Sequence, residues 1–333
     1  MIEDQPSLQF AAYRFRLRVL EPIHLPPNAG STLRGGFGAA FKRTACFQRN
    51  RLPDSCAGCM AEQNCPYGYI FETRIPPDSE LPRSQAEIPH PFVLEPPVDP
   101  PPVSEPGSTL EFRTVLVGRA IAYLPYFVLA FGRLGNDGIG RGRGRFDLEE
   151  VRAEHPIRGQ SEPIYSQGKL LPCSSDLTAT YSDLVQLCHD AAPDRVEVTF
   201  LSPTRLVSEH QLVTRPSFAV LIRAALRRIS ALSYFHCCHR WEADYKGIVS
   251  RAEGVQMVES QLRWVDWERY SSRQDARMKL GGVVGIACYE GEVAPFLPLL
   301  LAVSAVHVGK ACTFGNGRIA VNWASSGDAT ERI

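Results

Sequence analysis

The chain has 333 residues, and its 36 basic and 36 acidic side chains give a formal net charge of zero at pH 7. The hydrophobic fraction of 44% and the charged fraction of 22% lie near globular averages, which excludes a fully disordered chain and a long coiled coil. The neutral total argues against a nucleic-acid-binding protein. Basic residues nevertheless gather between residues 133 and 145 and between 263 and 279, so two local basic surfaces are expected.

Targeting and membrane-spanning segments are not expected. The sequence begins MIEDQPSLQF, with Glu3 and Asp4 where a signal peptide needs a basic and then an apolar run. The most apolar stretch, 293–306, contains two prolines and is shorter than the roughly 20 residues that cross a bilayer. We therefore expect a cytoplasmic protein that does not bind membranes. Its ten cysteines are then expected to be metal ligands or core thiols rather than disulfides.

The first half of the chain alternates between strand-like and helix-like segments. Residues 13–19 set four apolar side chains against three arginines, which predicts a half-buried strand with one cationic face. A helix is expected to begin at Ser31, a suitable N-cap, because apolar residues then recur every fourth position. The proline-rich segment 75–107 is interpreted as an extended surface loop. A strand in TLEFRTVLVG, an apolar helix in AIAYLPYFVLAFGRLG and the loop NDGIGRGRGRF follow.

The second half repeats this order. RVEVTFLSPTRL predicts a strand, and an amphipathic helix begins near Pro216. The strand KLGGVVGIACYEG, the helix APFLPLLLAVSAVHVG, a glycine-rich loop at 309–317 and the strand RIAVNW follow. Two successive units of similar order predict an α+β protein with two tandem ferredoxin-like domains, over residues 1–194 and 195–333.

Four cysteines in the first half form the sharpest local motif. Their spacing is C-x9-C-x2-C-x5-C, in which the C-x2-C pair can turn two thiolates onto one ion. Zinc is favoured and an iron–sulfur cluster is the alternative, because no standard ferredoxin spacing is present. Four ligands leave no open position, so the metal would be structural and would make residues 46–65 a metal-binding insertion in the first domain. Unliganded thiols are the competing interpretation. The predicted ligands are Cys46, Cys56, Cys59 and Cys65.

Two glycine-rich loops carry cations but match no nucleotide-binding fingerprint. GIGRGRG lacks a lysine followed by Ser or Thr and comes after a helix, and GKACTFGNGRI lacks the required spacing as well. Glycines interleaved with Arg and Lys let backbone N–H groups and cations approach a phosphate chain together. On the first predicted helix, Arg34 and Lys42 similarly flank Gly38, where a backbone could approach. Flexible turns with solvated charges are the plainer alternative.

Signatures of common hydrolytic sites are missing, which leaves histidine as the candidate acid or base. No paired carboxylates, G-x-S-x-G elbow or Cys/His protease motif is present. His24 lies where the first strand leads to the first helix, and His307 lies just before the second glycine-rich loop. Either can instead be a satisfied structural histidine.

The chain resembles the CRISPR precursor-RNA processing endoribonucleases of the RAMP superfamily, in a subgroup with an N-terminal four-cysteine cluster. The resemblance is carried by GSTLRGGFGAAFKR, the cysteines followed by PYGYIFET, HPFVLEPP, GIGRGRGRF, LSPTRL, LRWVDWERYSSRQDARMKLGGVVG and PFLPLLLAVSAVHVGKACTFGNGRI. These segments span nearly the whole chain. The glycine-rich loop after the last helix of the second domain is the most specific of them.

The resemblance implies cleavage of a CRISPR repeat transcript without a catalytic metal. The 2′-hydroxyl of the RNA attacks the adjacent phosphate and leaves a 2′,3′-cyclic phosphate and a 5′-hydroxyl, with a general base and a general acid moving the protons. It implies His24 as the catalytic histidine, His307 as the second choice and Lys42 as a stabiliser of the phosphate. The residues expected to contact RNA are Arg34, Arg141, Arg143, Arg269, Arg273, Lys279, Gly309, Lys310, Gly315, Gly317 and Arg318.

The expected partners are CRISPR repeat RNA and other subunits of a CRISPR effector complex, with no small-molecule substrate. A noncatalytic RNA-binding RAMP subunit of an interference complex is the main alternative, since it would carry the same glycine-rich loops. A cysteine-cluster redox protein is a third interpretation, and the lack of a flavin or nicotinamide motif counts against it.

Overall fold

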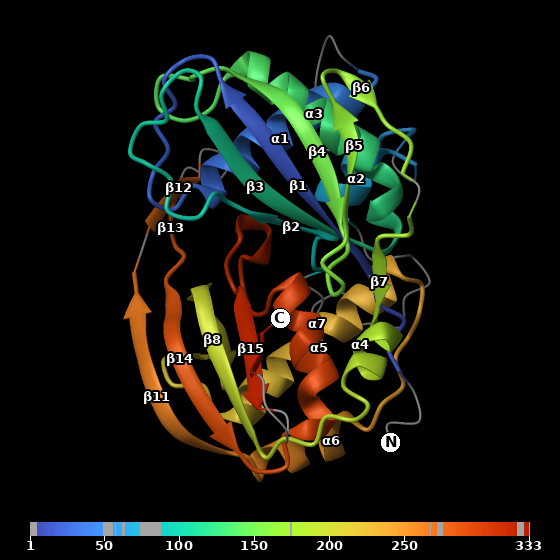
Figure 1. The fold of residues 1–333 in the computed structure, drawn as a ribbon, viewed down its shortest axis with the longest axis vertical. Coiled ribbons are helices and arrows are strands. Elements are labelled where there is room, and N and C mark those ends of the chain that lie inside the picture. The colour runs from blue at the N-terminus through green and yellow to red at the C-terminus, as the bar shows by residue number, and fades with distance from the viewer. Residues whose placement is uncertain are drawn as a thin grey trace. The chain divides into compact units, whose positions relative to one another are not determined.

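Two compact units make up the chain. The computed structural model divides into a first unit, Phe10–Thr178, and a second unit formed by Met1–Gln9 together with Ala179–Ile333 (Figure 1). Each unit has its own sheet and its own helices. The structure describes residues 5–48, 56, 58–61, 64–73, 88–173, 175–266, 268–271, 276–324 and 330–332.

An antiparallel sheet forms one layer of the first unit. Strand β1 (Gln9–Val19) pairs on one side with β3 (Thr109–Val117) and on the other with β4 (Phe146–Glu154). The order along the sheet is β2-β3-β1-β4-β5-β6. The remaining strands are β2 (Phe92–Glu95), β5 (Ser161–Ser166) and β6 (Lys169–Leu170), and β7 (Thr178–Thr180) follows them in the chain.

The alternation predicted for residues 13–19 is confirmed. Phe15 and Leu17 are buried, whereas the arginines between them lie on the opposite face of the sheet. Each of these arginines has a carboxylate partner on a neighbouring strand. We call this side the ion-pair face, and its pairs are Arg14 with Glu154, Arg16 with Glu111, Arg18 with Asp147, and Arg113 with Glu95 and Glu154.

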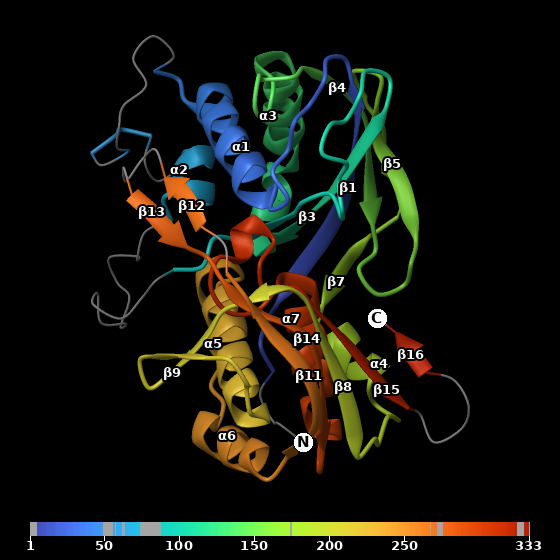
Figure 2. The same cartoon turned by 90° about the vertical axis from the view of Figure 1, so that its left-hand side faces the viewer.

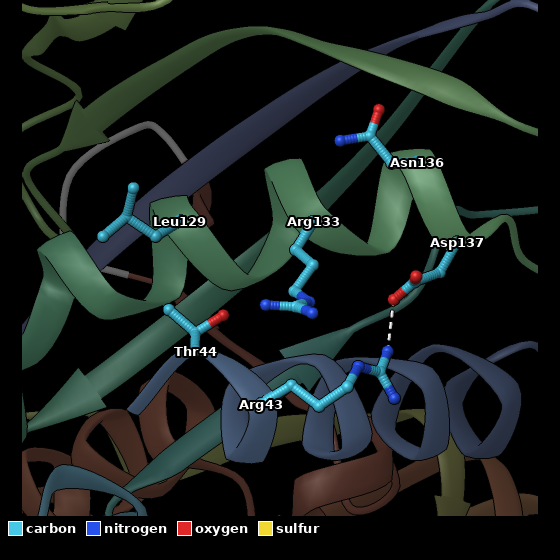
Figure 3. Close-up of a pocket in the computed structure, with 6 residues that line it drawn as sticks. All are labelled: Arg43, Thr44, Leu129, Arg133, Asn136 and Asp137. Carbon is cyan, nitrogen blue, oxygen red and sulfur yellow. Dashed lines mark hydrogen bonds and ion pairs between the residues drawn. The ribbon is translucent and has the colours of Figure 1, made fainter. Parts of the chain in front are cut away.

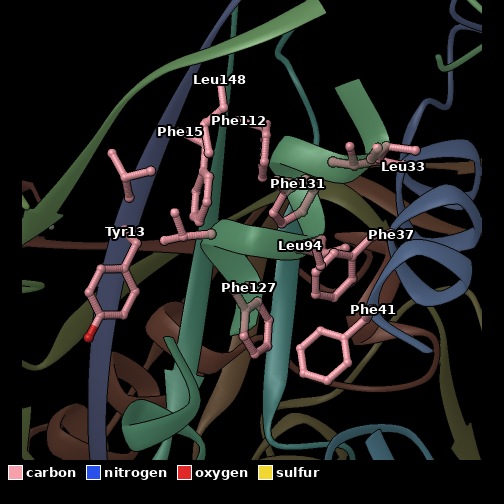
Figure 4. Packing of buried hydrophobic residues seen from close by; sticks show 14 of the residues in the cluster. Tyr13, Phe15, Leu33, Phe37, Phe41, Leu94, Phe112, Phe127, Phe131 and Leu148 are labelled. Atoms are coloured by element: carbon pink, nitrogen blue, oxygen red, sulfur yellow. The ribbon is translucent and has the colours of Figure 1, made fainter. Parts of the chain in front are cut away.

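Helices cover the other face of the sheet (Figures 1 and 2). Aromatic side chains of these helices and of the sheet form the core seen in Figure 4, where the ring centroids of Phe37 and Phe131 on the helices are 4.4 Å apart and those of Phe15 and Phe112 on the strands are 4.9 Å apart. Burying one such side chain stabilises the fold by about 1.5–3 kcal/mol. The helical segments of this unit are α1 (Gly30–Ala45), α2 (Pro66–Phe71), the 3-10 turn η1 (Gly118–Tyr123) and α3 (Leu124–Asp137).

Two local predictions for this unit are wrong. Ser31 does not cap α1, because the helix begins one residue earlier, with Ala29 at the N-cap and no side-chain cap. The proline-rich segment 75–107 is not wholly a loop, since it contains β2, whose four residues are all buried. The apolar run of β2 favours a covered strand, and the surrounding prolines hid that signal.

The second unit repeats the layered arrangement. Its sheet has the order β11-β14-β8-β15-β16, and helices lie against one face of it (Figure 1). The strands are β8 (Arg195–Thr204), β11 (Gln256–Val265), β14 (Gly282–Glu290), β15 (Ile319–Ala324) and β16 (Thr330–Arg332), with the small ladders β9 (Leu206–Ser208) with β10 (Gln211–Val213) and β12 (Glu268–Ser271) with β13 (Ala276–Lys279). The helical segments are α4 (Tyr181–Leu187), α5 (Phe218–His236), α6 (Tyr245–Glu253), η2 (Ala294–Phe296), α7 (Leu297–Val306) and η3 (Cys312–Phe314).

Strand order identifies both units as ferredoxin-like. In the first unit the four main strands follow β4-β1-β3-β2, and in the second they follow β15-β8-β14-β11. Numbered by their order in the chain, both sets read fourth, first, third, second, with one helical connection before the second strand and another before the fourth. The predicted pair of ferredoxin-like folds is therefore confirmed. The predicted division after residue 194 falls between α4 and β8.

The described helices range from six residues in α2 to 19 in α5. Within the described residues, none is long and apolar enough to cross a bilayer. The apolar helix α7 has ten residues and is buried in the second unit.

Candidate functional site

A glycine-rich hairpin of the first unit, residues 138–145, holds the backbone of His24. The Arg141 N–H donates to the His24 carbonyl at 3.0 Å, and the hairpin closes on itself through Ile139 N–H to Gly144 O at 3.0 Å. Gly140 has φ +76°, and a Cβ there would lie 2.3 Å from the His24 carbonyl oxygen. Only glycine fits such a close approach. The hairpin therefore fixes the segment that carries the candidate histidine.

The side chains around this hairpin form an exposed basic group. His24, Arg141 and Arg143 are all exposed, and Arg143 sits at φ +54°. Among the described residues, neither of these two arginines is ion-paired through its side chain. His24 was predicted as the catalytic histidine and the two arginines as RNA contacts of a distant loop, and the structure brings the loop to the His24 segment.

Helix α1 carries Arg34 and Lys42, each lying against an aromatic ring of α2. The Arg34 guanidinium carbon is 4.8 Å from the centroid of Phe71, and Lys42 Nζ is 5.1 Å from that of Tyr67. The expected backbone approach at Gly38 is wrong, because a Cβ there would already meet the Arg34 guanidinium at 3.0 Å and the Phe71 ring at 3.4 Å. The space beside Gly38 is filled by the chain's own side chains.

In the second unit, His307 anchors the glycine-rich loop 309–317 at its start. Its side chain is wholly buried, its φ is +62°, and its Nδ1 lies 2.9 Å from the Asn316 carbonyl oxygen. Asn316 is also buried, and its amide donates to the Leu280 carbonyl at 3.3 Å. Gly317 has φ +77° and lies so close to the chain that a Cβ would be 1.9 Å from the Val308 carbonyl oxygen.

The rest of this loop is fixed to the end of β8. Lys310 N–H donates to the Arg205 carbonyl at 3.1 Å, and Gly317 N–H donates to the Pro203 carbonyl at 3.2 Å. The Ser202 hydroxyl donates to the Gly315 carbonyl at 2.8 Å and accepts from Arg318 N–H at 2.9 Å. The expectation that backbone N–H groups of this loop point at a phosphate chain is thus wrong for Lys310 and Gly317. Both N–H groups bond to the protein.

Cationic side chains nevertheless gather around the loop. Lys310 is exposed, Arg318 is half-buried, and Arg205 lies beside Lys310 through the hydrogen bond above. Sequence reasoning missed Arg205. The motif LSPTRL contained it, but nothing in the spacing indicated that the end of β8 would meet a loop more than a hundred residues away in the chain.

The remaining basic candidates lie on the β12–β13 ladder. Arg269 is on β12, opposite Met278, and Lys279 is on β13, opposite Glu268. Arg273 falls between the two strands and lies outside the described residues. The ladder therefore keeps Arg269 and Lys279 within one short hairpin.

The cysteine cluster is partly folded into the first unit. Cys46 and Cys56 are buried, Cys59 and Cys65 are half-buried, and Cys59 N–H bonds to the Cys56 carbonyl at 3.3 Å, which makes the expected C-x2-C turn. Burial, followed by the nearby carboxylate of Glu72, raises the pKa of Cys56 to about 11. In the part of the chain that the structure describes, no three His, Cys, Asp or Glu side chains form a metal-ligand group.

A hollow of about 510 Å³ lies between α1 and α3 (Figure 3). Arg43 pairs across it with Asp137, and Arg133 reaches into it from α3. Arg43 lies in the last turn of α1, where a cation stabilises the helix dipole. These contacts connect α1 to α3 and stabilise the end of α1, so the hollow has a structural role and is not part of the candidate site.

Comparison with protein-family models covers both units. Residues 198–319 match the model described as "CRISPR-associated endoribonuclease Cas6", and residues 8–177 match AF_1859_N, described as an N-terminal domain. The match to the Cas6 model runs from β8 through the glycine-rich loop to the start of β15. The chain belongs to the family of the AF_1859_N domain, whose model covers just over half of it, and over residues 198–319 it is similar to the Cas6 endoribonucleases.

Individual relatives of this chain are distant. An uncharacterized protein of Archaeoglobus fulgidus is 30% identical over 133 residues, which cover 40% of this chain and 43% of that protein, so the alignment spans less than half of the relative. The structure of Thermus thermophilus Cas6 matches with a TM-score of 0.54 at 14% identity, over 95% of this chain and 98% of that one. A chain of a partial Cas6-RT-Cas1–Cas2 complex matches with a TM-score of 0.58 at 13% identity, over 100% of this chain and 49% of that one. Both structures share the fold.

Proposed function

We propose that this protein is an endoribonuclease that cuts CRISPR repeat transcripts into guide RNAs. The observation that carries the proposal is the exposed His24, held by the 138–145 hairpin beside Arg141 and Arg143, in a chain whose residues 198–319 match the Cas6 model. A histidine next to two cations suits attack on a phosphodiester, because imidazole moves protons near neutral pH while guanidinium groups stabilise the charge that develops on phosphorus oxygens.

The proposed reaction is a transphosphorylation that needs no metal. The 2′-oxygen of the RNA loses its proton to a general base and forms a bond to the adjacent phosphorus, while the bond from phosphorus to the 5′-oxygen breaks. The departing 5′-oxygen takes a proton, which leaves a 2′,3′-cyclic phosphate and a 5′-hydroxyl. His24 is assigned one of the two proton transfers, and Arg141 is assigned to the phosphate.

Other candidates are assigned to binding. Lys42 and Arg34 remain proposed phosphate contacts of the first unit, and Lys310 and Arg318 are proposed contacts of the second. His307 fits catalysis less well than His24, because a wholly buried ring bound to the Asn316 carbonyl has no surface for a substrate. We propose that it positions the glycine-rich loop.

The deciding experiment is cleavage of a CRISPR repeat RNA in EDTA, with His24→Ala and a 2′-deoxy substitution at the cut site. Wild type should cut in chelator, the deoxy substrate should resist, and His24→Ala should lose about 100-fold or more in rate. His189→Ala is the matched control, because His189 is exposed on the second unit and belongs to none of the proposed sites. If wild type binds the RNA tightly and leaves it intact, the protein is instead a noncatalytic RNA-binding subunit.

We also propose a structural zinc at the cysteine cluster. Its support is the donor set of four cysteines between residues 46 and 65, two of them joined by a turn. The ion would hold this insertion together and take no part in cleavage. Elemental analysis of the purified protein should find one zinc per chain. Finding iron together with visible absorption would indicate an iron–sulfur cluster in place of zinc. A folded protein without metal would contradict the proposal.

Other CRISPR proteins are proposed as partners. The support is the fold shared with a chain of the Cas6-RT-Cas1–Cas2 complex. Affinity purification of the tagged protein from its own cells should recover CRISPR-associated subunits together with guide RNA. Recovery of guide RNA with no such subunit would contradict the proposed partnership.

A further inference from the structure

A compact group of three tyrosines and one arginine lies on the helical side of the first unit. We call it the Tyr–Arg cluster, and its members are Tyr69 of α2, Arg119 and Tyr123 of η1, and Tyr126 of α3. The ring centroids of Tyr69 and Tyr123 are 5.4 Å apart, and those of Tyr123 and Tyr126 are 6.2 Å apart. The cluster thus joins α2 to the continuous η1–α3 segment through aromatic contacts.

Arg119 is held over two of these rings. Its guanidinium carbon lies 5.0 Å from the centroid of Tyr69 and 5.8 Å from that of Tyr123, and its Nη2 donates to the Tyr123 hydroxyl at 3.0 Å. The rings therefore hold the planar guanidinium in place before any ligand arrives. Such an arrangement is typical of a cation positioned by aromatic faces.

The charge of Arg119 is not neutralised within the cluster. Among the described residues, no carboxylate forms an ion pair with Arg119, and its side chain is exposed while the three tyrosine rings are half-buried. This differs from the ion-pair face, where each arginine of β1 has a carboxylate partner. An exposed, oriented guanidinium without an acid offers both a stacking plane and a positive charge.

The cluster shares helix α2 with a residue pair already proposed to bind RNA. Helix α2 carries Tyr67 two positions before Tyr69, and Tyr67 lies under Lys42 of α1, a proposed phosphate contact. Figure 2 shows α2 beside α1. The same short helix therefore carries a buried and a half-buried tyrosine, each with a cation over its ring, on different faces of the helix.

We propose that the Tyr–Arg cluster binds unpaired nucleobases of single-stranded RNA. Bases stack on aromatic rings and on arginine planes, and every base has a π face, so the site would be tolerant of sequence. This inference rests on the proposed function, since it names a subsite for the same substrate. The cluster would hold a single-stranded part of the transcript, separate from His24 and the protein hairpin 138–145 that holds its backbone.

The test measures binding of short RNAs without cleavage. The probes are a fluorescent oligoadenylate and an abasic oligomer with the same number of phosphates, followed by anisotropy. Arg119→Ala should weaken oligoadenylate binding about tenfold, and Arg119→Lys should weaken it nearly as much, because lysine keeps the charge but loses the plane. Arg16→Ala is the control, since it removes the same charge from the ion-pair face and should change little.

A further variant separates stacking from folding. Tyr123→Phe keeps the ring and removes the hydroxyl that orients Arg119, so it should weaken binding less than Arg119→Ala while the thermal midpoint stays close to wild type. Recovery of full affinity by Arg119→Lys, or an equal loss for the abasic oligomer, would overturn the proposal in favour of charge alone. Unchanged binding by Arg119→Ala would also overturn it and would indicate a protein-facing surface.

The outcomes also separate this inference from the proposed function. If oligoadenylate binding depends on Arg119 but the protein leaves repeat RNA uncut, base stacking on the Tyr–Arg cluster is retained and the proposed nuclease function is overturned. If the protein cuts repeat RNA but Arg119→Ala does not change oligoadenylate binding, the nuclease function is retained and base stacking on the cluster is overturned.

Discussion

Gly140 and Gly142 stand two positions apart in the same hairpin, both at positive φ, and only one of them meets another backbone. A Cβ at Gly140 would lie 2.3 Å from the His24 carbonyl oxygen, whereas a Cβ at Gly142 would have nothing within 4 Å. Alanine at the two positions therefore separates the free-energy cost of an unusual φ from that of a displaced contact. Adding one methyl group at Gly140 tests whether the hairpin positions His24.

Alanine at the two positions should give different results. Gly142→Ala is expected to cost about 1 kcal/mol of unfolding free energy, from backbone strain alone. Gly140→Ala is expected to cost about 3 kcal/mol and to lower the cleavage rate of the folded protein, because the His24 segment must move. Urea unfolding and single-turnover cleavage measure the two effects. Equal losses at both positions would show that contact with His24 is irrelevant.

A substitution at His307 tests whether this residue positions the glycine-rich loop or takes part in catalysis. Its ring is buried and bound to the Asn316 carbonyl, so His307→Ala should leave a buried acceptor unsatisfied and cost about 1–3 kcal/mol. RNA affinity should fall because the glycine-rich loop loses its anchor, while the cleavage rate at saturating RNA should persist. A dead enzyme with normal affinity and stability would instead make His307 catalytic.

In the sheet of the first unit, two ion pairs differ in burial, so the stability lost when their arginine is removed should differ as well. Arg113 has a side-chain exposure of 21% and contacts Glu95 at 5%, whereas Arg18 and Asp147 are more than half exposed. Removing the cation from a buried carboxylate leaves a desolvated charge, but removing it from an exposed one leaves a charge in water.

Methionine at these two arginines should therefore differ in effect. Arg113→Met is expected to cost about 2–3 kcal/mol and Arg18→Met less than about 0.5 kcal/mol. Thermal or urea unfolding of both variants, compared at the same pH and salt, provides the measurement. A similar small loss for both would mean that Glu95 finds other partners when Arg113 is absent.

The elements were predictable where periodicity was strong and local. The alternation of residues 13–19 and the spacing of Leu33, Phe37 and Phe41 predicted β1 and α1, because each pattern reports which face is buried. The strand β2 was missed, because prolines around it are typical of loops while its own burial depends on α1 and β3.

The candidate site was less predictable than the fold. Sequence reasoning proposed both glycine-rich loops and both histidines, but it could not determine that Arg141 bonds to the His24 carbonyl or that Arg205 lies beside Lys310. These contacts join residues far apart in the chain, and their geometry is set by packing. Burial also distinguishes the exposed His24 from the buried His307, which a sequence pattern cannot do.

At the scale of the whole molecule, a net charge of zero should not prevent salt-dependent RNA binding. Lys310, Arg141 and Arg143 are exposed at the loops, whereas three carboxylates of the first sheet, those of Glu111, Asp147 and Glu154, are occupied by arginines of the ion-pair face. Each phosphate contact adds about 0.7 to the slope of log affinity against log salt for a single strand. Lys310→Ala should reduce that slope by about this amount, and Arg16→Ala should leave it unchanged. Equal slopes in a salt titration of wild type and Lys310→Ala would remove Lys310 from the interface.

The ion-pair face has a consequence for where RNA can settle. Much of the free energy of binding a nucleic acid comes from mobile ions that diffuse away when a cation meets a phosphate. On this face the counterions of Arg14, Arg16 and Arg18 are carboxylates fixed to the same sheet, so they cannot be released. A phosphate arriving there would meet this tethered negative charge and would have to displace a carboxylate before it could pair with an arginine. We therefore expect RNA to bind the loops and helices of the first unit rather than its ion-pair face.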